Sequence, residues 1–565
     1  MTPRNASTAM ATVLVDELIR CGVREIVLAP GSRSAALAFA AHAAASEGRV
    51  RLHVRIDERS AGFLALGMAK TSHRPVPVIT TSGTAVANLH PAVLEASHVG
   101  IPLVVLGADR PAGLRGTNAN QTTDQVKLFG DAVRAFADVP PGFAGPSETQ
   151  QVASWRSLVA RMTATAAGRT TSAPGPVHLN AQFSEPMTPD AEGGWNSDCS
   201  GRSDGMPWTT TANPPLHQPE LLDTGPERTV LVAGDDAGPP ARILAEQAGW
   251  PILAEPTSGA RTGDNAIRTY RLLLADGGLS SRIERVVVCG HPTLSRPVTA
   301  LLSRTDVEVI AIPTATGWTD PGHQVSRVVQ AVTAPPGDPA WLKEWQERDA
   351  ALSRKLDELL ETQGELTPHQ VAATVSAALP PAGLLFVGAS NPVRDLDLTV
   401  AHYRAGERRL VIANRGLAGI DGSVSSAIGA ALGRTGTSRA FALLGDVTFL
   451  HDSNGLVIGP DEARPDLTIV VANDDGGSIF ASLEQGGPSY SSSYDKLFGT
   501  PHGTDIAALC AATRTPHWRV NSTDELRHAL ASPSGGIEVV EAVVRRDNRR
   551  ELDAAIRNLG VSTVV

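Results

Sequence analysis

The sequence has few of the features that mark exported or membrane proteins. Only four of its 565 residues are cysteines, and they are too scattered to suggest a disulfide framework or a set of metal ligands. No apolar run reaches the roughly 18 residues that a membrane span requires. The N-terminus also lacks a basic start followed by an apolar core. We therefore expect no membrane span, no signal peptide and a cytoplasmic location.

Positive charge is also in deficit. The formal net charge is −10, which argues against nucleic acid as the main partner. Any basic residues that bind anions must therefore be placed locally. An apolar content of 42% and a charged content of 19% are typical of an ordinary globular protein. A chain of this length is too long for one core, so we expect roughly three or four domains.

Strand-like and helix-like segments alternate in the first third of the sequence. Apolar runs at 25–29, 76–81 and 102–106 each lead into a polar turn, and helix-like stretches follow the first two. This alternation predicts βαβ units and a parallel sheet, which binds ligands at the turns that follow its strands. We therefore predict an α/β domain over residues 1–185.

The rest of the sequence divides into four further segments. Residues 186–227 are rich in Gly, Ser, Thr, Pro and Asp, which is typical of a linker or a long surface connection. Strand-like runs resume in 228–335, where we predict a central α/β domain, and a connecting helix is expected over 336–364. Residues 365–565 repeat the strand-and-turn plan of the first third. The predicted fold class is α/β, with three domains whose parallel sheets are flanked by helices.

Two turns in the last third carry a candidate metal site. Gly445-Asp446 closes the apolar run 440–444, and the run 467–472 ends in Asn473-Asp474-Asp475-Gly476-Gly477. The interval between them is long enough for a strand, a crossover and a return strand. Two adjacent strand ends would then place oxygen ligands side by side, able to hold a divalent cation against a diphosphate. Either motif alone could be a helix cap, but the two together favour the cation site.

This pairing resembles the signature of thiamin-diphosphate (ThDP) enzymes, and a distant motif agrees with it. Asp57-Glu58 follows the short extended run 53–56. The two carboxylates could simply cap the next helix, but beside the metal motif we favour catalysis. The resemblance implies the ThDP-binding fold, with pyrimidine and diphosphate domains around a central domain, and Mg²⁺ or Mn²⁺ as the metal. It also implies that Glu58 hydrogen-bonds the aminopyrimidine ring and helps to generate the reactive ylide.

The resemblance implies a set of contacts to the cofactor and its metal. The expected metal ligands are Asp446, Asp474 and the carbonyl of Gly476. Whether Asn473 or Asp474 touches the ion stays open, because such enzymes usually have an Asn-Asn pair there. Ile420 is expected beneath the bend of the cofactor, where an ordinary core isoleucine would look the same. The expected cofactor-binding residues are Glu58, Ser82, Gly83, Asn88, Ser390, Ile420, Gly445, Asp446, Val447, Asn473, Ile479 and Phe480.

Arginines fall just beyond several strand-like runs, where parallel sheets bind ligands. They are Arg33, Arg110, Arg394 and Arg415, and Arg296 joins them by residue type and local spacing. An arginine fork binds a carboxylate bidentately, although any single one of these could be a surface ion pair. Several of them in an acidic protein indicate a polyanionic substrate.

Further segments resemble one family of ThDP enzymes. They are residues 29–34, 55–61, 81–88, 108–111, 119–121, 414–416, 419–422 and 476–480. Together they are similar to the 2-succinyl-5-enolpyruvyl-6-hydroxy-3-cyclohexene-1-carboxylate (SEPHCHC) synthases of menaquinone biosynthesis. The resemblance implies a transferase that decarboxylates 2-oxoglutarate and adds the succinyl carbanion to isochorismate, giving SEPHCHC and CO₂.

The same resemblance distributes the polar residues between the two dicarboxylate substrates. Ser390, Arg394 and Arg415 are expected to hold the chain that comes from 2-oxoglutarate. The residues expected to face isochorismate are Ser32, Arg33, Arg110, Gln121 and Arg296, and Gln121 joins Glu58 as a catalytic residue. The resemblance also implies a homodimer or homotetramer, in which Glu58 comes from one chain and the metal half of each site from the other.

Two rival functions remain open on the sequence alone. The first is a pyruvate-consuming ThDP enzyme such as an acetolactate synthase, for which the arginines would be excessive. The second is a catalytically silent ThDP-fold protein that binds a ligand as a sensor. Turnover of pyruvate but not of 2-oxoglutarate would favour the first, and cofactor binding without CO₂ release would favour the second.

Overall fold

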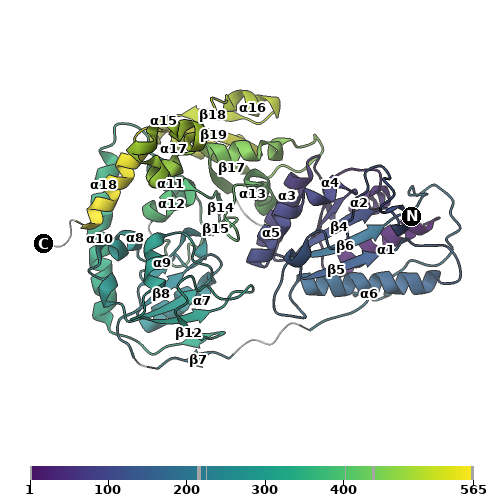
Figure 1. Ribbon diagram of the computed structural model, residues 1–565, viewed down its shortest axis with the longest axis horizontal. Helices are drawn as coiled ribbons and strands as arrows, with labels where there is room; N and C mark the ends of the chain where they lie inside the picture. Colours follow the sequence, from purple (N-terminus) through teal and green to yellow (C-terminus); the bar gives the residue numbers. More distant parts are fainter. Residues whose placement is uncertain (1–2, 213–217, 224, 401, 435–438, 562–565) are drawn as a thin grey trace. The chain divides into compact units, whose positions relative to one another are not determined.

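The computed structural model describes residues 3–212, 218–223, 225–400, 402–434 and 439–561. These residues form two compact units. The first takes the described residues of Met1–Pro215, Asp421–Gly436 and Asp452–Pro465, and the second takes those of Leu216–Ile420, Thr437–His451 and Asp466–Val565. Each unit is built from parallel sheets flanked by helices (Figure 1), which confirms the predicted fold class. The predicted domain boundaries stay a prediction.

One six-stranded parallel sheet forms the first unit, in the order β2-β1-β3-β4-β6-β5. Its strands are β1 (Glu25–Leu28), β2 (Arg51–Val54), β3 (Val76–Thr80), β4 (Leu103–Asp109), β5 (Ala135–Val139) and β6 (Val177–Gln182). Its helices are α1 (Ala6–Arg20), α2 (Ala35–Ser46), α3 (Glu58–Ser72), α4 (Thr84–Ala87), α5 (His90–Val99), α6 (Glu148–Ala166) and α13 (Ser423–Gly433). Every residue of β4 is buried, as expected where helices cover both faces of a sheet.

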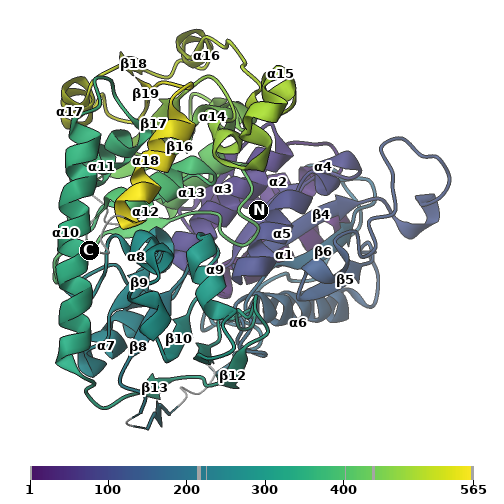
Figure 2. The same cartoon turned by 60° about the vertical axis from the view of Figure 1, so that its left-hand side comes forward.

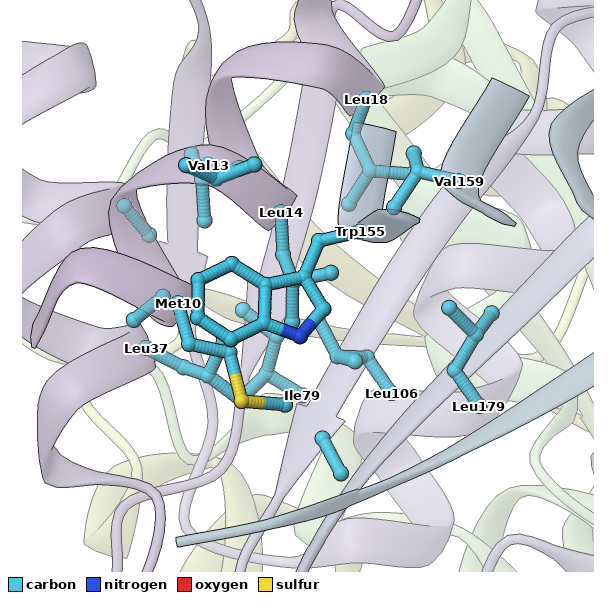
Figure 3. Packing of buried hydrophobic residues seen from close by; sticks show 14 of the residues in the cluster. Met10, Val13, Leu14, Leu18, Leu37, Ile79, Leu106, Trp155, Val159 and Leu179 are labelled. Carbon is cyan, nitrogen blue, oxygen red and sulfur yellow. The ribbon is translucent and has the colours of Figure 1, made fainter. Parts of the chain in front are cut away.

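The core of the first unit lies between the sheet and helices α1, α2 and α6. Met10 and Leu14 of α1 pack with Trp155 of α6 and Leu106 of β4 (Figure 3). The preceding Asn5 fixes the start of α1, because its side chain accepts a hydrogen bond from the backbone N–H of Thr8 at 2.9 Å. The apolar face of α1 is thereby directed onto the sheet.

A buried histidine makes this unit sensitive to acid. His178 of β6 is fully buried beside Phe129 and Phe136, and burial lowers its pKa to about 4. The unfolded chain takes up this proton near pH ~6.5, so stability falls as the pH drops from there toward 4. Acid lowers the free energy of unfolding through this proton uptake by about 3 kcal/mol, and we expect His178→Leu to remove that contribution. Urea unfolding of both proteins at pH 4.5 and 7 measures it, and an equal pH dependence in the variant would contradict the assignment.

The second unit contains a five-stranded parallel sheet in the order β12-β11-β10-β8-β9. Its strands are β8 (Thr229–Ala233), β9 (Ile252–Ala254), β10 (Arg285–Cys289), β11 (Glu308–Ile312) and β12 (Val325–Val328); the pair β7 (Glu220–Leu221) and β13 (Val332–Thr333) is separate. The helices here are α7 (Gly238–Ala248), α8 (Tyr270–Asp276), α9 (Arg296–Leu302) and α10 (Pro339–Glu361). The predicted connecting helix is thus α10. Its Trp341 and Trp345 are buried in the core of this central sheet, and α10 packs against α8 and against α18 (Arg549–Val561; Figure 2).

A second six-stranded sheet in this unit has the order β15-β14-β16-β17-β19-β18. Its strands are β14 (Leu384–Val387), β15 (Leu410–Ile412), β16 (Ala440–Gly445), β17 (Leu467–Asn473), β18 (His517–Val520) and β19 (Ile537–Val543). Its helices are α11 (Pro368–Ala378), α12 (Asn391–Thr399), α14 (Asp446–His451), α15 (Ser491–Tyr494), α16 (Ile506–Ala512), α17 (Thr523–Ala531) and α18 (Arg549–Val561). The order repeats that of the first sheet strand for strand, which confirms the predicted repeat of architecture.

The predicted linker 186–227 has almost no regular structure, and residues 213–217 and 224 lie outside the described residues. Its first part packs onto the first unit. Trp195 is buried and stacks on Trp155, with ring centroids 5.8 Å apart, and Glu148 accepts hydrogen bonds from the backbone N–H groups of Asn196 and Ser197. Of the two sequence readings, a surface connection describes this part better than a free linker.

Two further properties bear on the sequence expectations. All four cysteines carry free thiols, and burial raises the pKa of Cys289 to about 12. Among the helices that the structure describes, none combines the length and the apolar character needed to cross a lipid bilayer.

Candidate active site

The ends of β16 and β17 lie side by side, as the sequence predicts. Gly445 is in register with Ala472 of the neighbouring parallel strand, and Asp446 begins α14 directly after β16. Asp446 is only 2% exposed. Its carboxylate accepts hydrogen bonds from the backbone N–H of Val447 at 2.6 Å and of Gly476 at 2.8 Å. The strand end and the turn after β17 are therefore joined through Asp446.

Asp446 and Asp474 form a pair of desolvated carboxylates. Burial raises the pKa of Asp446. Burial, and then the charge of Asp446, raise the pKa of Asp474 to about 7. Among the described residues, Oδ1 of Asp474 is buried without a hydrogen-bond partner. Two carboxylates that disfavour each other's charge suit a divalent cation, which stabilises both ionised forms.

Asn473 is directed elsewhere. Its side-chain amide donates to Glu541 at 2.7 Å, and its side-chain oxygen accepts from the backbone N–H of Asp475 at 3.0 Å. Asp474 instead lines a cavity together with Asp446. Of the two ligands left open by the sequence, the geometry favours Asp474. The described residues contain no group of three or more His, Cys, Asp and Glu side chains placed to hold a metal. The expected set would not form such a group, because it consists of two carboxylates and one backbone carbonyl.

A cavity of about 150 Å³ opens between these strand ends. The expected residues that line it are Ser390, Ile420, Gly445, Asp446, Val447, Asp474, Gly476, Ile479 and Phe480. Sequence reasoning missed others that line it, namely Asn391, Asp395, Thr448, Ser478 and Arg549. Asn391, Thr448 and Ser478 are close in sequence to expected residues, which was the available signal. Arg549 comes from α18 and pairs with Asp395 at 2.6 Å, a contact that no local pattern announces.

Backbone conformation is unusual at two places in this cavity. Gly476 has φ +146°, and a Cβ there would lie 2.0 Å from the carbonyl oxygen of Gly499, so only glycine fits. Ser390 has φ 70° and ψ −134°, a region that non-glycine residues rarely adopt. Strain of this kind persists where the surrounding structure enforces it, and it is concentrated at ligand sites. Both residues belong to the expected set.

Two of the expected substrate arginines lie together in the second unit. Arg394 of α12 donates to the backbone carbonyl of Ser390 at 2.6 Å, and Arg415 donates to the hydroxyl of Thr293 at 2.7 Å. Burial lowers the pKa of Arg394, and the nearby charge of Arg415 lowers it further. Arg296 differs, because its side chain is 78% exposed and pairs with Glu484 at 3.1 Å. The pair Arg394 and Arg415 is thus a desolvated double positive charge, which suits a carboxylate.

A second group of expected residues lies in the first unit, at the ends of β1, β3 and β4. The guanidinium of Arg110 donates to the hydroxyl of Ser82 and to the carbonyl of Gln121. The side chain of Gln121 donates to the carbonyl of Ser82 at 3.1 Å. Burial, and then the charge of Arg110, lower the pKa of Arg33. Four expected residues, from four separate segments, are therefore brought together.

The remaining expected residues of the first unit lie around these strand ends. Ser32 and Asn88 are exposed, and the backbone N–H of Gly83 donates to Gln125 at 2.8 Å. Glu58 is half-buried as the first residue of α3. The capping role falls to Asp57, whose side chain accepts from the N–H groups of Arg59 and Ser60. Glu58 is therefore not needed as a cap.

Comparison with known proteins identifies the domains to which much of the chain corresponds. Residues 8–128 match the family model of the N-terminal TPP binding domain of thiamine pyrophosphate enzymes, and residues 396–542 match that of the C-terminal TPP binding domain. The sequence is 57% identical to the SEPHCHC synthase of Nocardioides sp., over 98% of each chain. It is 48% identical to that of Kineococcus radiotolerans and 45% identical to that of Mycobacterium bovis, in each case over 98% of this chain and 99% of the relative.

Proposed function

The chain belongs to the family of SEPHCHC synthases, and from this we propose that it decarboxylates 2-oxoglutarate and joins the succinyl unit to isochorismate. The products would be SEPHCHC and CO₂, in a step of menaquinone biosynthesis that takes place in the cytoplasm. The observation that carries the proposal is sequence identity of 57% and 48% to two SEPHCHC synthases over nearly the full length of both chains. The desolvated arginine pair, Arg394 and Arg415, supports a substrate with more than one carboxylate.

The matched domains are thiamin-diphosphate-binding domains, and we assign the metal end of that cofactor to the cavity at the ends of β16 and β17, because two carboxylates line it. In our proposal Asp446, Asp474 and the carbonyl of Gly476 hold Mg²⁺ or Mn²⁺. Ser390, Ile479 and Phe480 would line the cofactor, with Ile420 beneath its bend. When bound, ThDP supplies the electron sink for decarboxylation.

The protein's own side chains would orient the substrates and move protons. Glu58 would hydrogen-bond the aminopyrimidine ring and exchange a proton with it. Arg394 and Arg415 would bind the distal carboxylate of 2-oxoglutarate. The isochorismate contacts would come from Ser32, Arg33, Arg110, Gln121 and Arg296. As the resemblance to ThDP enzymes implies, we also propose a homo-oligomer with shared sites, in which Glu58 comes from one chain and the metal ligands come from its partner.

The two candidate ligands after β17 can be separated by a pair of alanine variants. We expect Asp474→Ala to weaken Mg²⁺-dependent ThDP binding by roughly 100-fold, because it removes a charged ligand. Asn473→Ala should change the same affinity by less than about tenfold, because it loses only hydrogen bonds outside the cavity. Fluorescence titration with ThDP at fixed Mg²⁺ gives both affinities. A larger loss in Asn473→Ala would reverse the assignment.

One assay tests the proposed function against its rivals. Purified protein with ThDP and Mg²⁺ is given 2-oxoglutarate and isochorismate, and both isochorismate loss and CO₂ release are followed. We expect the two to proceed in equal amounts. Turnover of pyruvate instead would favour an acetolactate-synthase-like enzyme, and ThDP binding without CO₂ release would favour a non-catalytic binding protein.

A further inference from the structure

A buried carboxyl group at the carboxyl edge of the central sheet has no role in the proposed mechanism. Glu255 follows β9 and is 2% exposed. Its Oε1 accepts hydrogen bonds from the backbone N–H groups of Thr293 at 2.9 Å and Leu294 at 2.8 Å, in the loop after β10. Within the described part of the chain, its Oε2 is buried without a hydrogen-bond partner. A buried polar atom of this kind calls for an explanation, because it loses its solvation.

Thr293 links Glu255 to the arginine pair. Its backbone N–H is held by Glu255, while its hydroxyl accepts the hydrogen bond from Nη2 of Arg415 at 2.7 Å. Arg415 is 3% exposed, and its Nε is another buried atom for which the described residues offer no partner. Thr293, which follows a strand of the central sheet, therefore links Glu255 to Arg415, which follows a strand of the last sheet. Arg394 lies near Arg415 at this place.

The charge state of Glu255 is compatible with a carboxylate-binding site at the arginine pair. Burial raises its pKa to about 8, against the opposing effects of the Leu294 N–H and the charge of Arg415. The other groups that interact with it are Tyr270 of α8, and Arg394 and Asp397 of α12. Near neutral pH a protonated Glu255 leaves the charges of the arginine pair available to a carboxylate. Above pH ~8 an ionised Glu255 would compete with that carboxylate.

We propose that Glu255 is a positioning residue, which holds Arg415 through Thr293 so that Arg415 and Arg394 receive the distal carboxylate of a dicarboxylic 2-oxoacid. The proposal rests on the proposed function, which assigns this arginine pair to 2-oxoglutarate. Glu255 and Thr293, which follow strands of the central sheet, would then contribute to substrate selection. Oε2 of Glu255 and Nε of Arg415, which have no hydrogen-bond partner among the described residues, are then atoms of a binding site rather than packing defects.

Two variants of the full-length protein, loaded with ThDP and Mg²⁺, test the proposal. Thr293→Val keeps the shape of the side chain and removes the acceptor for Arg415. We expect its KM for 2-oxoglutarate to rise about tenfold, with kcat and the KM for isochorismate nearly unchanged. Glu255→Gln keeps an acceptor for both N–H groups but cannot ionise. The wild-type KM for 2-oxoglutarate should rise about tenfold between pH 7 and 9, and that of Glu255→Gln should stay level.

Glu308→Gln is the matched control. Glu308 is the first residue of β11, so it lies at the amino ends of the strands of the same sheet, where it pairs with Arg285 at 2.7 Å. Its KM values should follow those of the wild type at every pH. If the wild type is active and both test variants keep its KM values at every pH, the proposal is overturned and the proposed function stands. A pH effect shared equally by the KM for isochorismate would also overturn it. A wild type that does not consume 2-oxoglutarate would overturn the proposed function together with this inference. If Thr293→Val does not fold, the pH profile of Glu255→Gln decides alone.

Discussion

Asp446→Asn is expected to lower turnover of 2-oxoglutarate and isochorismate by about 100-fold or more at saturating ThDP. The substitution keeps the size of the side chain but removes the charge that faces Asp474 across the cavity. A neutral amide is a poor ligand for a hard divalent cation. The Mg²⁺ concentration that gives half-maximal turnover should therefore rise as well, and steady-state assays over a range of Mg²⁺ measure both effects.

The control for this variant is Asp349→Asn. Asp349 of α10 likewise accepts hydrogen bonds from two backbone N–H groups, those of Arg268 and Thr269, but it lies outside the cavity. Its replacement should leave turnover and the Mg²⁺ requirement close to those of the wild type. If both variants lose activity alike, the effect of Asp446→Asn is structural. If neither does, Asp446 does not hold the metal.

Glu58→Gln is expected to lower kcat by about 1,000-fold while the affinity for ThDP changes by less than about tenfold. Glutamine can still hydrogen-bond the aminopyrimidine ring, but it cannot exchange a proton with it. The carboxylate is available for this task because Asp57 already caps α3. Single-turnover release of CO₂, measured beside ThDP titration of the same sample, separates the chemical step from cofactor binding.

Asp57→Asn is the matched control for Glu58, since asparagine caps helices about as well as aspartate. Its kcat should stay within about tenfold of the wild-type value. Wild-type turnover in Glu58→Gln would remove Glu58 from the mechanism. A loss of ThDP affinity as large as the loss of kcat would reduce Glu58 to a binding role.

The adjacent positions of the proposed metal ligands, Asp446 and Asp474, were predictable because their signals are local. Gly445-Asp446 and the turn after β17 each close a short apolar run, and parallel strands bring their carboxyl ends to one edge. The choice between Asn473 and Asp474 was not predictable. Successive side chains of an extended segment point to opposite sides, and the sequence does not say where the strand ends. In the structure Asn473 turns to Glu541 and Asp474 to the cavity.

The contacts made over long sequence separations were beyond the sequence. Glu255 reads as an ordinary residue after a short strand, yet it is fixed by the loop after β10 and lies near Arg394 of α12. Arg549 reads as a surface residue of an amphipathic helix, yet it is buried against Asp395. Arg394 and Arg415 could be proposed from the sequence because they fall shortly after strands, β14 and β15. Residues whose roles depend on packing between different sheets carry no such mark.

The account depends on a metal-anchored cofactor at the ends of β16 and β17. Calorimetric titration of ThDP into protein that has been stripped of metal, with and without added Mg²⁺, tests it most directly. With Mg²⁺ present we expect saturable binding of one ThDP per chain. With excess EDTA we expect this heat signal to be nearly abolished, and in Asp446→Asn we expect it to be much weaker. Equal ThDP binding with and without the metal, or no binding under any condition, would contradict the account.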